Sequence, residues 1–307
     1  MDTPRKRQRP LQEVLEMRIE GNDVVIEGRL LKSVRLEHEW HDDIQDPETF
    51  RMALHKSNVA ADLFTFWQRY PSSKQKFNYT AEWEDLAVLP VRSFEEWWSD
   101  RIKSRTRGLV RKSEKIGVVV REAEFDDDFV RGMVEIFNET PVRQGRPFWH
   151  YGKNFDTVKA QFSRFLFRED IIGAYYEGEL IGFVMLSNAG DYAYLGQIIS
   201  KIKHRDKAPN NALMAKAVEV TARKRIPYLV YNYWNESGLT EFKRRNGFES
   251  QSVPRYYLPL TMKGRVALSL GAHRPVAKIL PKRFVLRLKQ LRAVLYTRLY
   301  GPAPNNA

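Results

Sequence analysis

Residues Gly196 to Phe248 decide the fold. They begin Gly196-Gln-Ile-Ile-Ser-Lys-Ile-Lys-His-Arg-Asp-Lys-Ala-Pro-Asn-Asn-Ala-Leu213, continue as a helical run to Lys224 and a short apolar strand, and end Phe242-Lys-Arg-Arg-Asn-Gly-Phe248. A strand therefore leads through a cationic loop into the start of a helix. The unpaired backbone amides and the positive dipole end at such a helix start bind phosphate well. This stretch predicts an enzyme that handles a phosphorylated donor.

The composition bounds the class of protein. The chain has 307 residues, 43% of them hydrophobic, so we expect one large or two modest domains with a sizeable core. Cysteine is absent, which excludes disulfides, a catalytic thiolate and cysteine-ligated metals. We see no convincing set of metal ligands and expect no metal cofactor. No run of about 18 apolar residues occurs, so we expect a cytoplasmic protein without a spanning helix.

The positive charge is unevenly distributed. The net charge is +13, and the stretch from Ser250 to Ala307 contains eleven Lys or Arg and no Asp or Glu. Residues 1–19 contain further cations, and we interpret them as a solvated flexible tail. A basic surface attracts nucleic acid, anionic lipid or a phosphorylated substrate, and charge alone does not choose among these partners.

Residues 20–92 predict a smaller mixed α/β layer. Alternating and β-branched residues over 22–40 indicate a strand or hairpin. Asp46-Pro47-Glu48 is typical of a helix start. The aromatic and apolar runs over 62–70 and 79–91 predict two strands.

A new pattern begins at Ser93. The run Ser93-Phe-Glu-Glu96 is a capping box, and we expect one helix from it through Trp97 and Trp98 to Lys115, ended by Gly117. Further strands are predicted over 118–120, 171–176, 180–187, 192–200, 228–233 and 248–260, and further helices over 126–137, 156–167, 211–224 and 239–246. This order predicts an α/β (α+β) fold with a mixed, mostly antiparallel sheet and helices on both faces.

Two patterns resemble a known superfamily. The element order, with its ending Phe242-Lys-Arg-Arg-Asn-Gly247-Phe248, resembles the Gcn5-related acyl-CoA N-acyltransferases and their motif B. The pair Trp97-Trp98, followed by the basic run to Gly117 and Val120, is similar to the FemAB-like and BioF2-like branch. Two letters depart from the pattern: the loop after Gly196 has no glycine, and Lys243 stands where motif B often has a Tyr acid.

The resemblance implies where the donor binds. The thioester would lie in a gap between two strands, with the pantetheine arm along the backbone of Ile198 and Ile199. The residues implied for the pyrophosphate are Asn210, Asn211 and Ala212 through their amides, and Arg205 and Lys207 through their charge. A backbone amide there could also stabilise the oxyanion of the intermediate. The alternative reading is a solvated basic loop with an asparagine helix cap.

The loop 140–153 is the candidate acceptor site. It combines cations, aromatic rings and one histidine, which suit an anionic or sugar-like acceptor. We expect acceptor contacts from Arg143, Gln144, Arg146 and Trp149.

Four residues are candidates for proton transfer. His150 could act as the general base, because an amine must lose a proton to attack, and Tyr151 could act as acid or hydrogen-bond donor. Tyr231 and Tyr233 could protonate the leaving thiolate. For all four the alternative is core packing or a structural hydrogen bond.

Two basic surfaces add candidate partners. The helix carrying Arg105, Arg107 and Arg111 could contact tRNA, the donor carrier of FemAB-like relatives, or be a solvated face. Residues 280–300 carry apolar side chains at three- and four-residue spacing between cations. Such a helix could lie on an anionic membrane at the inner surface or pack on the protein.

Three functions remain open at this point. The first is an N-acyltransferase that uses acyl-CoA and an amine acceptor, such as a sugar, lipid or peptide precursor of the cell envelope. The second is a FemAB-like transferase that uses aminoacyl-tRNA, and the third is a non-catalytic binding or membrane-associated module. We expect these regions: a basic tail (1–19), an N-terminal mixed domain or half-copy (20–92), an acyltransferase-like domain (93–262) and a basic amphipathic C-terminal segment (263–307).

Overall fold

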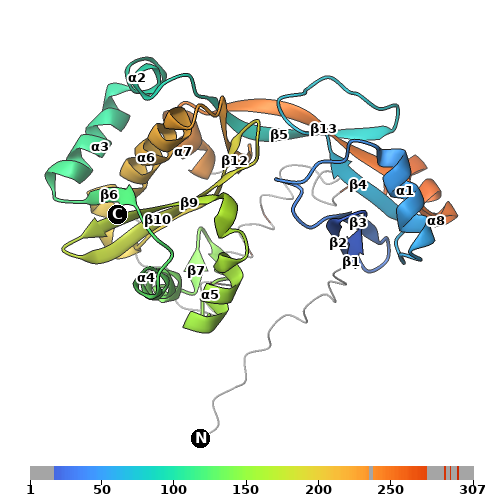
Figure 1. Cartoon of the computed structure of the whole chain (residues 1–307), viewed down its shortest axis with the longest axis horizontal. Coiled ribbons are helices and arrows are strands. Elements are labelled where there is room, and N and C mark those ends of the chain that lie inside the picture. The colour runs from blue at the N-terminus through green and yellow to red at the C-terminus, as the bar shows by residue number, and fades with distance from the viewer. Residues whose placement is uncertain (1–16, 235–237, 275–286, 288–290, 292–295, 297–307) are drawn as a thin grey trace, which may run out of the picture. The chain divides into compact units, whose positions relative to one another are not determined.

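The chain forms two compact units. The computed structural model describes residues 17–234 and 238–274, together with Arg287, Leu291 and Tyr296. Of the described residues, unit 1 comprises 17–84 and 252–274, and unit 2 comprises 85–234 and 238–251. Two long strands, β5 and β13, each begin in one unit and end in the other (Figure 1).

Unit 2 is built on a mixed, mostly antiparallel sheet, as the sequence predicts. The strand order is β5-β12-β11-β10-β9-β6, and β11 with β12 is its one parallel neighbour pair among the described residues. The strands are β5 (Thr80–Pro90), β6 (Val119–Glu122), β9 (Glu169–Tyr176), β10 (Glu179–Asn188), β11 (Ala193–Ser200) and β12 (Tyr228–Tyr233). Glu177 and Gly178 join β9 to β10 with φ of 51° and 82°, the conformation that a two-residue hairpin requires.

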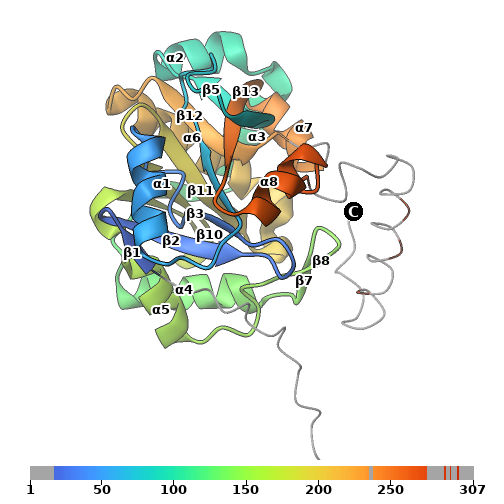
Figure 2. The same cartoon turned by 90° about the vertical axis from the view of Figure 1, so that its right-hand side faces the viewer.

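Helices cover both faces of this sheet (Figure 1 and Figure 2). One face carries α3 (Ser104–Lys115) and α6 (Pro209–Arg223), and the other carries α4 (Asp127–Asn138) and α5 (Phe155–Ser163). Each layer has its own buried apolar cluster, with Leu213 and Val218 in one and Met133 and Phe137 in the other. Each such side chain contributes roughly 1.5–3 kcal/mol when it is fully buried, so the two clusters fix the helices on the sheet. The last helix of the unit is α7 (Gly238–Arg245).

The predicted single helix from Ser93 to Lys115 is wrong. The Ser93 cap forms, with its Oγ accepting the Glu96 amide at 3.0 Å, but α2 (Phe94–Glu96) passes into one π-helical turn and ends. Ile102 is extended and buried, and α3 starts afresh after it. Trp97 donates its indole N–H to the Asn246 carbonyl at 2.9 Å, so a distant partner fixes the π turn.

Unit 1 has the strand order β1-β2-β3-β4-β13. Its elements are β1 (Met17–Ile19), β2 (Asn22–Glu27), β3 (Ser33–Leu36), α1 (Pro47–Lys56), β4 (Leu63–Trp67), β13 (Glu249–Pro259) and α8 (Met262–Ser269). Asp46 caps α1 as predicted, accepting the amides of Glu48 and Thr49. β13 pairs with β4 from Arg255 to Pro259, so this end of the predicted region 93–262 belongs with the N-terminal layer.

The remaining elements are short. They are the hairpin β7 (Val142–Arg143) and β8 (Arg146–Pro147), the 3-10 turn η2 (Leu166–Arg168) and the 3-10 helix η3 (Ile202–Lys207). Most of the predicted basic helix over 280–300 lies outside the described residues. Among the described residues, no helix is long and apolar enough to cross a membrane.

Candidate functional site

The parallel strands β11 and β12 pair over only a short distance. Their ladder consists of Ala193 with Leu229 and Tyr194 with Val230. Beyond these two pairs, the described residues of β11 have no ladder to β12. Both strands are irregular here: the register of β11 with β10 shifts at Gly196, and Asn232 of β12 has a φ of 54° and accepts the Tyr194 hydroxyl at 3.0 Å. The end of β11 therefore presents an unpaired backbone edge toward β12.

A cavity of about 520 Å³ lies against this part of β11. It is lined by Val142, Arg143, Gln144, Gly145, Phe148, Gln197, Ile198, Ile199, Ser200, Ile202, Arg205 and Asn210. Four residues of the predicted donor set and two of the predicted acceptor set thus share one cavity. Its lining contains two guanidinium groups and no carboxylate, which suits an anionic or strongly polar ligand.

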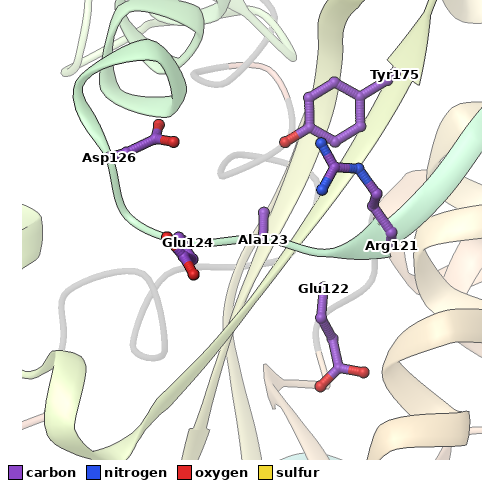
Figure 3. A pocket seen from close by; sticks show the side chains of 6 residues that line it. All are labelled: Arg121, Glu122, Ala123, Glu124, Asp126 and Tyr175. Carbon is purple, nitrogen blue, oxygen red and sulfur yellow. The ribbon is translucent and has the colours of Figure 1, made fainter.

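A second cavity of about 390 Å³ has the opposite character (Figure 3). Arg121 stacks on the ring of Tyr175, with 4.7 Å between guanidinium carbon and ring centre. Three carboxylates, those of Glu122, Glu124 and Asp126, complete the charged lining. An anionic donor is therefore better accommodated by the cavity at β11.

The cationic loop enters α6 through a strained residue. Ala208 has a φ of 53°, and Pro209 follows it at the first position of the helix. Asn210 lines the cavity, and its Oδ1 is buried without a hydrogen-bond partner. Because an unpaired buried polar atom is costly, this amide oxygen is suited to receive an N–H or O–H group from a ligand.

Two of the three amides predicted to hold a pyrophosphate, those of Asn211 and Ala212, already donate within the protein, and so do two amides earlier in the loop. The amides of Ile202 and Lys203 donate to the carboxylate of Glu139 at 2.6 and 2.9 Å. Those of Asn211 and Ala212 donate to the Ala208 carbonyl at 3.0 and 3.5 Å. Glu139 was not predicted, because the two amides that it accepts lie more than 60 residues away in the sequence.

A buried lysine supports the loop. Lys201 is 4% exposed and donates to Glu135 at 2.6 Å and to Glu179. Burial opposes ionisation of Glu179, but hydrogen bonds from Lys201, Lys203 and His204 lower its pKa to about 2. Ion pairs within the protein therefore hold this loop.

Arg143 lines the cavity, and its two terminal nitrogens donate within the protein. It donates to the carbonyls of Ser200 and Ile136 and to the Glu139 carboxylate, each at 3.0 Å. Burial lowers its pKa. Arg143 thus ties the hairpin of β7 and β8 to the end of β11, and Gln144 is the other predicted acceptor residue at the cavity.

His150 lies in the apolar layer beside α4. It is 3% exposed, and its ring stacks on Phe137 at 4.2 Å with planes 11° apart. Burial, with a smaller contribution from the Lys153 charge, lowers its pKa to about 3. His150 does not line the cavity. Its ring packs among aromatic side chains of the core.

Its neighbours in the sequence are exposed. Trp149 is 67% exposed and carries the Lys153 ammonium 3.4 Å from its ring centre, and Tyr151 is 37% exposed. Neither residue lines the cavity, and neither does Arg146 on β8. Of the donor set, Lys207, Asn211 and Ala212 also lie outside the lining.

A buried lysine, Lys243, lies at the end of β12. The sequence analysis noted it only because it stands where motif B often has a tyrosine. Lys243 of α7 is 2% exposed, and its Nζ donates to the Tyr233 carbonyl at 2.7 Å and lies 4.6 Å from the Tyr231 ring centre. Burial lowers the pKa of Lys243 to about 8 and raises that of Tyr231 far above its usual range. Lys243 therefore exchanges a proton near neutral pH more readily than Tyr231 does.

A possible metal-ligand set belongs to unit 1, whereas the cavity is built by unit 2. Asp23, Glu37 and His38 bring ligand atoms within 4.8 Å of one another. Two carboxylates and an imidazole could hold a divalent ion. These three residues do not line the cavity at β11.

Comparisons with known proteins identify the fold. No protein-family model and no curated protein matches the sequence. Among solved structures, the C-terminal domain (DUF2156) assigned to a lysylphosphatidylglycerol synthetase of Agrobacterium fabrum is similar at a TM-score of 0.56 and 15% identity, over 83% of this chain and 86% of that one.

Two further solved structures are similar to this chain over most of its length. L-PGS from Bacillus licheniformis is similar at a TM-score of 0.56 and 14% identity, over 94% of this chain and 89% of that one. FemX is similar at 0.50 and 11% identity, over 76% and 83%. The chain thus has the Gcn5-related N-acyltransferase fold, as the sequence predicts. At these identities the likeness establishes the fold alone.

Proposed function

We propose that this protein is an acyltransferase whose donor is an aminoacyl ester of tRNA, and that it transfers the aminoacyl group to a nucleophile of a cell-envelope precursor. The observation that carries the proposal is the cavity at the unpaired edge of β11, where predicted donor and acceptor residues meet. An extended backbone edge binds a linear donor by main-chain hydrogen bonds. A free amide on that edge stabilises the oxyanion of the intermediate.

The state of the loop amides supports an ester donor over acyl-CoA. An acyl-CoA pyrophosphate needs several free amides at the start of α6, and those of Asn211 and Ala212 already donate to the Ala208 carbonyl. In the preceding helix η3, the amides of Ile202 and Lys203 donate to Glu139. An aminoacyl ester places a primary ammonium beside its carbonyl instead. The unpaired Oδ1 of Asn210 offers that ammonium an acceptor. The name of one similar structure, a lysylphosphatidylglycerol synthetase, also specifies a lysyl product.

The reaction needs a group that moves a proton. The acceptor amine or hydroxyl loses a proton as it attacks the ester carbonyl, and the leaving ribose oxygen gains one. Lys243, at the end of the strand across from β11, is the ionisable group whose pKa lies nearest to neutrality there. Because Lys243 does not line the cavity, we assign it a proton transfer that runs through bound water and not through direct contact with the substrate.

Acyl-CoA is the second candidate donor. Arg205 and Asn210 both line the cavity, and the dipole of α6 points its positive end toward the same loop. A CoA phosphate could use these groups if it displaced Glu139 from the amides of Ile202 and Lys203.

A binding measurement separates the two donors. The ligands are total bacterial aminoacyl-tRNA, the same tRNA after deacylation, CoA and acetyl-CoA, and the readout is fluorescence anisotropy or calorimetry. We expect charged tRNA to bind more tightly than deacylated tRNA, and Arg205→Glu to weaken charged tRNA by about tenfold. Arg146→Glu is the matched control, because Arg146 is an exposed arginine outside the cavity lining. Arg146→Glu should reduce the preference for charged over deacylated tRNA far less than Arg205→Glu does.

Turnover provides the second arm. Transfer of a labelled amino acid from tRNA into a total lipid and soluble extract should fall by about 10²–10⁴-fold in Lys243→Met, with donor binding unchanged. Micromolar binding of acetyl-CoA without any preference for charged tRNA would support the second donor. Absence of both binding modes would reject catalysis and leave a binding module.

A further inference from the structure

The helix α8 of unit 1 exposes an apolar stripe. Met262, Val266 and Leu270 are 69%, 52% and 77% exposed, and their four-residue spacing places them on one side of the helix and its last turn. Large aliphatic side chains in a contiguous exposed row are uncommon on a soluble surface and mark an interaction site.

The buried face of α8 determines how the helix is oriented on unit 1. Gly264 and Ala267 are buried, and a Cβ at Gly264 would lie 2.0 Å from the Asp62 carbonyl oxygen. Thr261 caps the helix by accepting the Gly264 amide at 3.1 Å. Because the helix backbone lies directly on Asp62, the stripe is held away from unit 1.

One loop residue extends the stripe into a patch. Lys263 donates its ammonium to the Leu30 carbonyl and to Asp62, which brings the loop between β2 and β3 beside α8. The Leu30 side chain is 86% exposed. We define the α8 patch as Leu30, Met262, Val266 and Leu270.

Cations surround the α8 patch. On the helical wheel, Lys263 and Arg265 fall on opposite sides of the stripe, and both are exposed. Exposed Arg29 and Lys32 flank Leu30 in the neighbouring loop. The nearby carboxylate of Asp62 pairs with Lys263 and also accepts from Thr261 and the Lys32 amide, so the positive charge of the rim comes from Arg265, Arg29 and the Lys32 side chain. The patch thus has an apolar centre and a positive rim.

We propose that the α8 patch docks on an anionic lipid surface. Aliphatic side chains enter the boundary of the acyl chains, while flanking Lys and Arg side chains reach anionic headgroups. A nucleic acid would use the cations, but it would leave four aliphatic side chains in water and find no aromatic ring among them to stack on. The proposal is independent of the donor assignment.

Charge argues against the other occupants. Residues 275–307 contain seven Lys or Arg and no Asp or Glu, so this segment would bring like charge to the rim. A second copy in a symmetric contact would place the same cations opposite each other. Only an anionic partner complements both the rim and the centre.

The absence of cysteine allows a site-specific test. Leu270→Cys in the full chain carries an environment-sensitive fluorophore, and Phe167→Cys in unit 2, where Phe167 is 83% exposed, is the matched control. We expect a blue shift at position 270, and none at 167, with vesicles containing about 30% phosphatidylglycerol in phosphatidylcholine. Pure phosphatidylcholine vesicles should leave both positions unchanged.

A second variant tests the stripe without a label. Met262→Ser, Val266→Ser and Leu270→Ser together should lower the partition onto the anionic vesicles by about tenfold or more. These side chains are exposed, so the thermal unfolding midpoint should not fall. Partition equal to that of the wild type overturns the proposal. A blue shift at position 270 without vesicles also overturns it. If that shift depends on protein concentration, the patch binds a second copy of the protein. If it disappears in a chain ending at residue 274, the patch binds the chain's own tail.

Discussion

His150 and Lys243 are both buried and ionisable, but their surroundings differ. The His150 ring is enclosed by aromatic side chains, and burial brings its pKa to about 3, so it stays neutral at ordinary pH. Lys243 keeps a polar partner in the Tyr233 carbonyl, and its pKa of about 8 leaves both protonation states accessible. The environment of each side chain, rather than its residue type, decides which of them can move a proton.

His150→Phe should make the protein more tolerant of acid. The folded-state pKa of His150 lies below the unfolded value of about 6.5, so the folded state binds fewer protons. The wild type should therefore lose stability as the pH falls from 6.5 toward 3, by about 2 kcal/mol at pH 5. The phenyl ring keeps the stacking on Phe137 and does not titrate. Urea unfolding at pH 7.5 and at pH 5 measures the difference.

The same variant decides whether His150 acts as a base. With the ring acting only in packing, the transfer rate of His150→Phe should stay within about twofold of the wild type. A loss of about 10² or more, at unchanged stability at pH 7.5, would assign the base role to His150 after all.

At the residue scale, the sequence predicted what is local. Ile198, Ile199, Arg205 and Asn210 follow one another along the chain, the resemblance implied them together, and they line one cavity. Glu139 was not predictable in the same way, because its role depends on amides that the fold brings to it from far along the chain.

Helices show the same division between local and distant causes. The helix starts at Asp46, Ser93 and Asp126 lie where they were predicted, because the cap at each depends on amides two or three residues away. The break at Ile102 was missed, because the bond from the Trp97 indole to Asn246 has no counterpart in local spacing.

Two helical glycines should respond to alanine in opposite ways. In α8, Gly264→Ala places a methyl group 2.0 Å from a backbone oxygen, so we expect a loss of about 3 kcal/mol in unit 1. In α3, Gly108 is exposed with nothing within 4 Å of its Cβ position. Gly108→Ala should therefore stabilise unit 2 by about 0.5–1 kcal/mol through helix propensity. Chemical denaturation of the two variants measures both effects.

The pair contains its own control, because the substitution is the same and only the packing differs. A Gly264→Ala protein as stable as the wild type would show that α8 does not lie against Asp62. The outward orientation of the α8 patch would then lose its structural basis.

For the whole molecule, the order of elements predicted the sheet and its helices, because each element carries its own periodicity and end signals. The division of the chain into two units was harder to predict from the sequence. β13 reads as one continuous strand, and only its pairing with β4 shows that its second half belongs to unit 1. Such pairing joins residues about 190 positions apart, and no local pattern encodes the partner.

Each unit has its own core, so damage to one core should be felt mainly in that unit. Tyr256 is fully buried in unit 1, where its hydroxyl donates to Gln68 at 2.7 Å and its ring contacts Phe66. Phe183 is fully buried in unit 2 between Phe129 and Phe137. Replacement of either ring by alanine should cost about 3–5 kcal/mol.

Hydrogen exchange read by mass spectrometry shows where that loss falls. In Tyr256→Ala, the amides of β2 to β4 should exchange faster while those of β9 and β10 keep their protection, and Phe183→Ala should give the reverse pattern. Because β5 and β13 run through both units, protection at their midpoints should fall in both variants. Equal loss of protection across all strands in either variant would mean that the chain unfolds as one cooperative body. The two cores would then not be separate sources of stability.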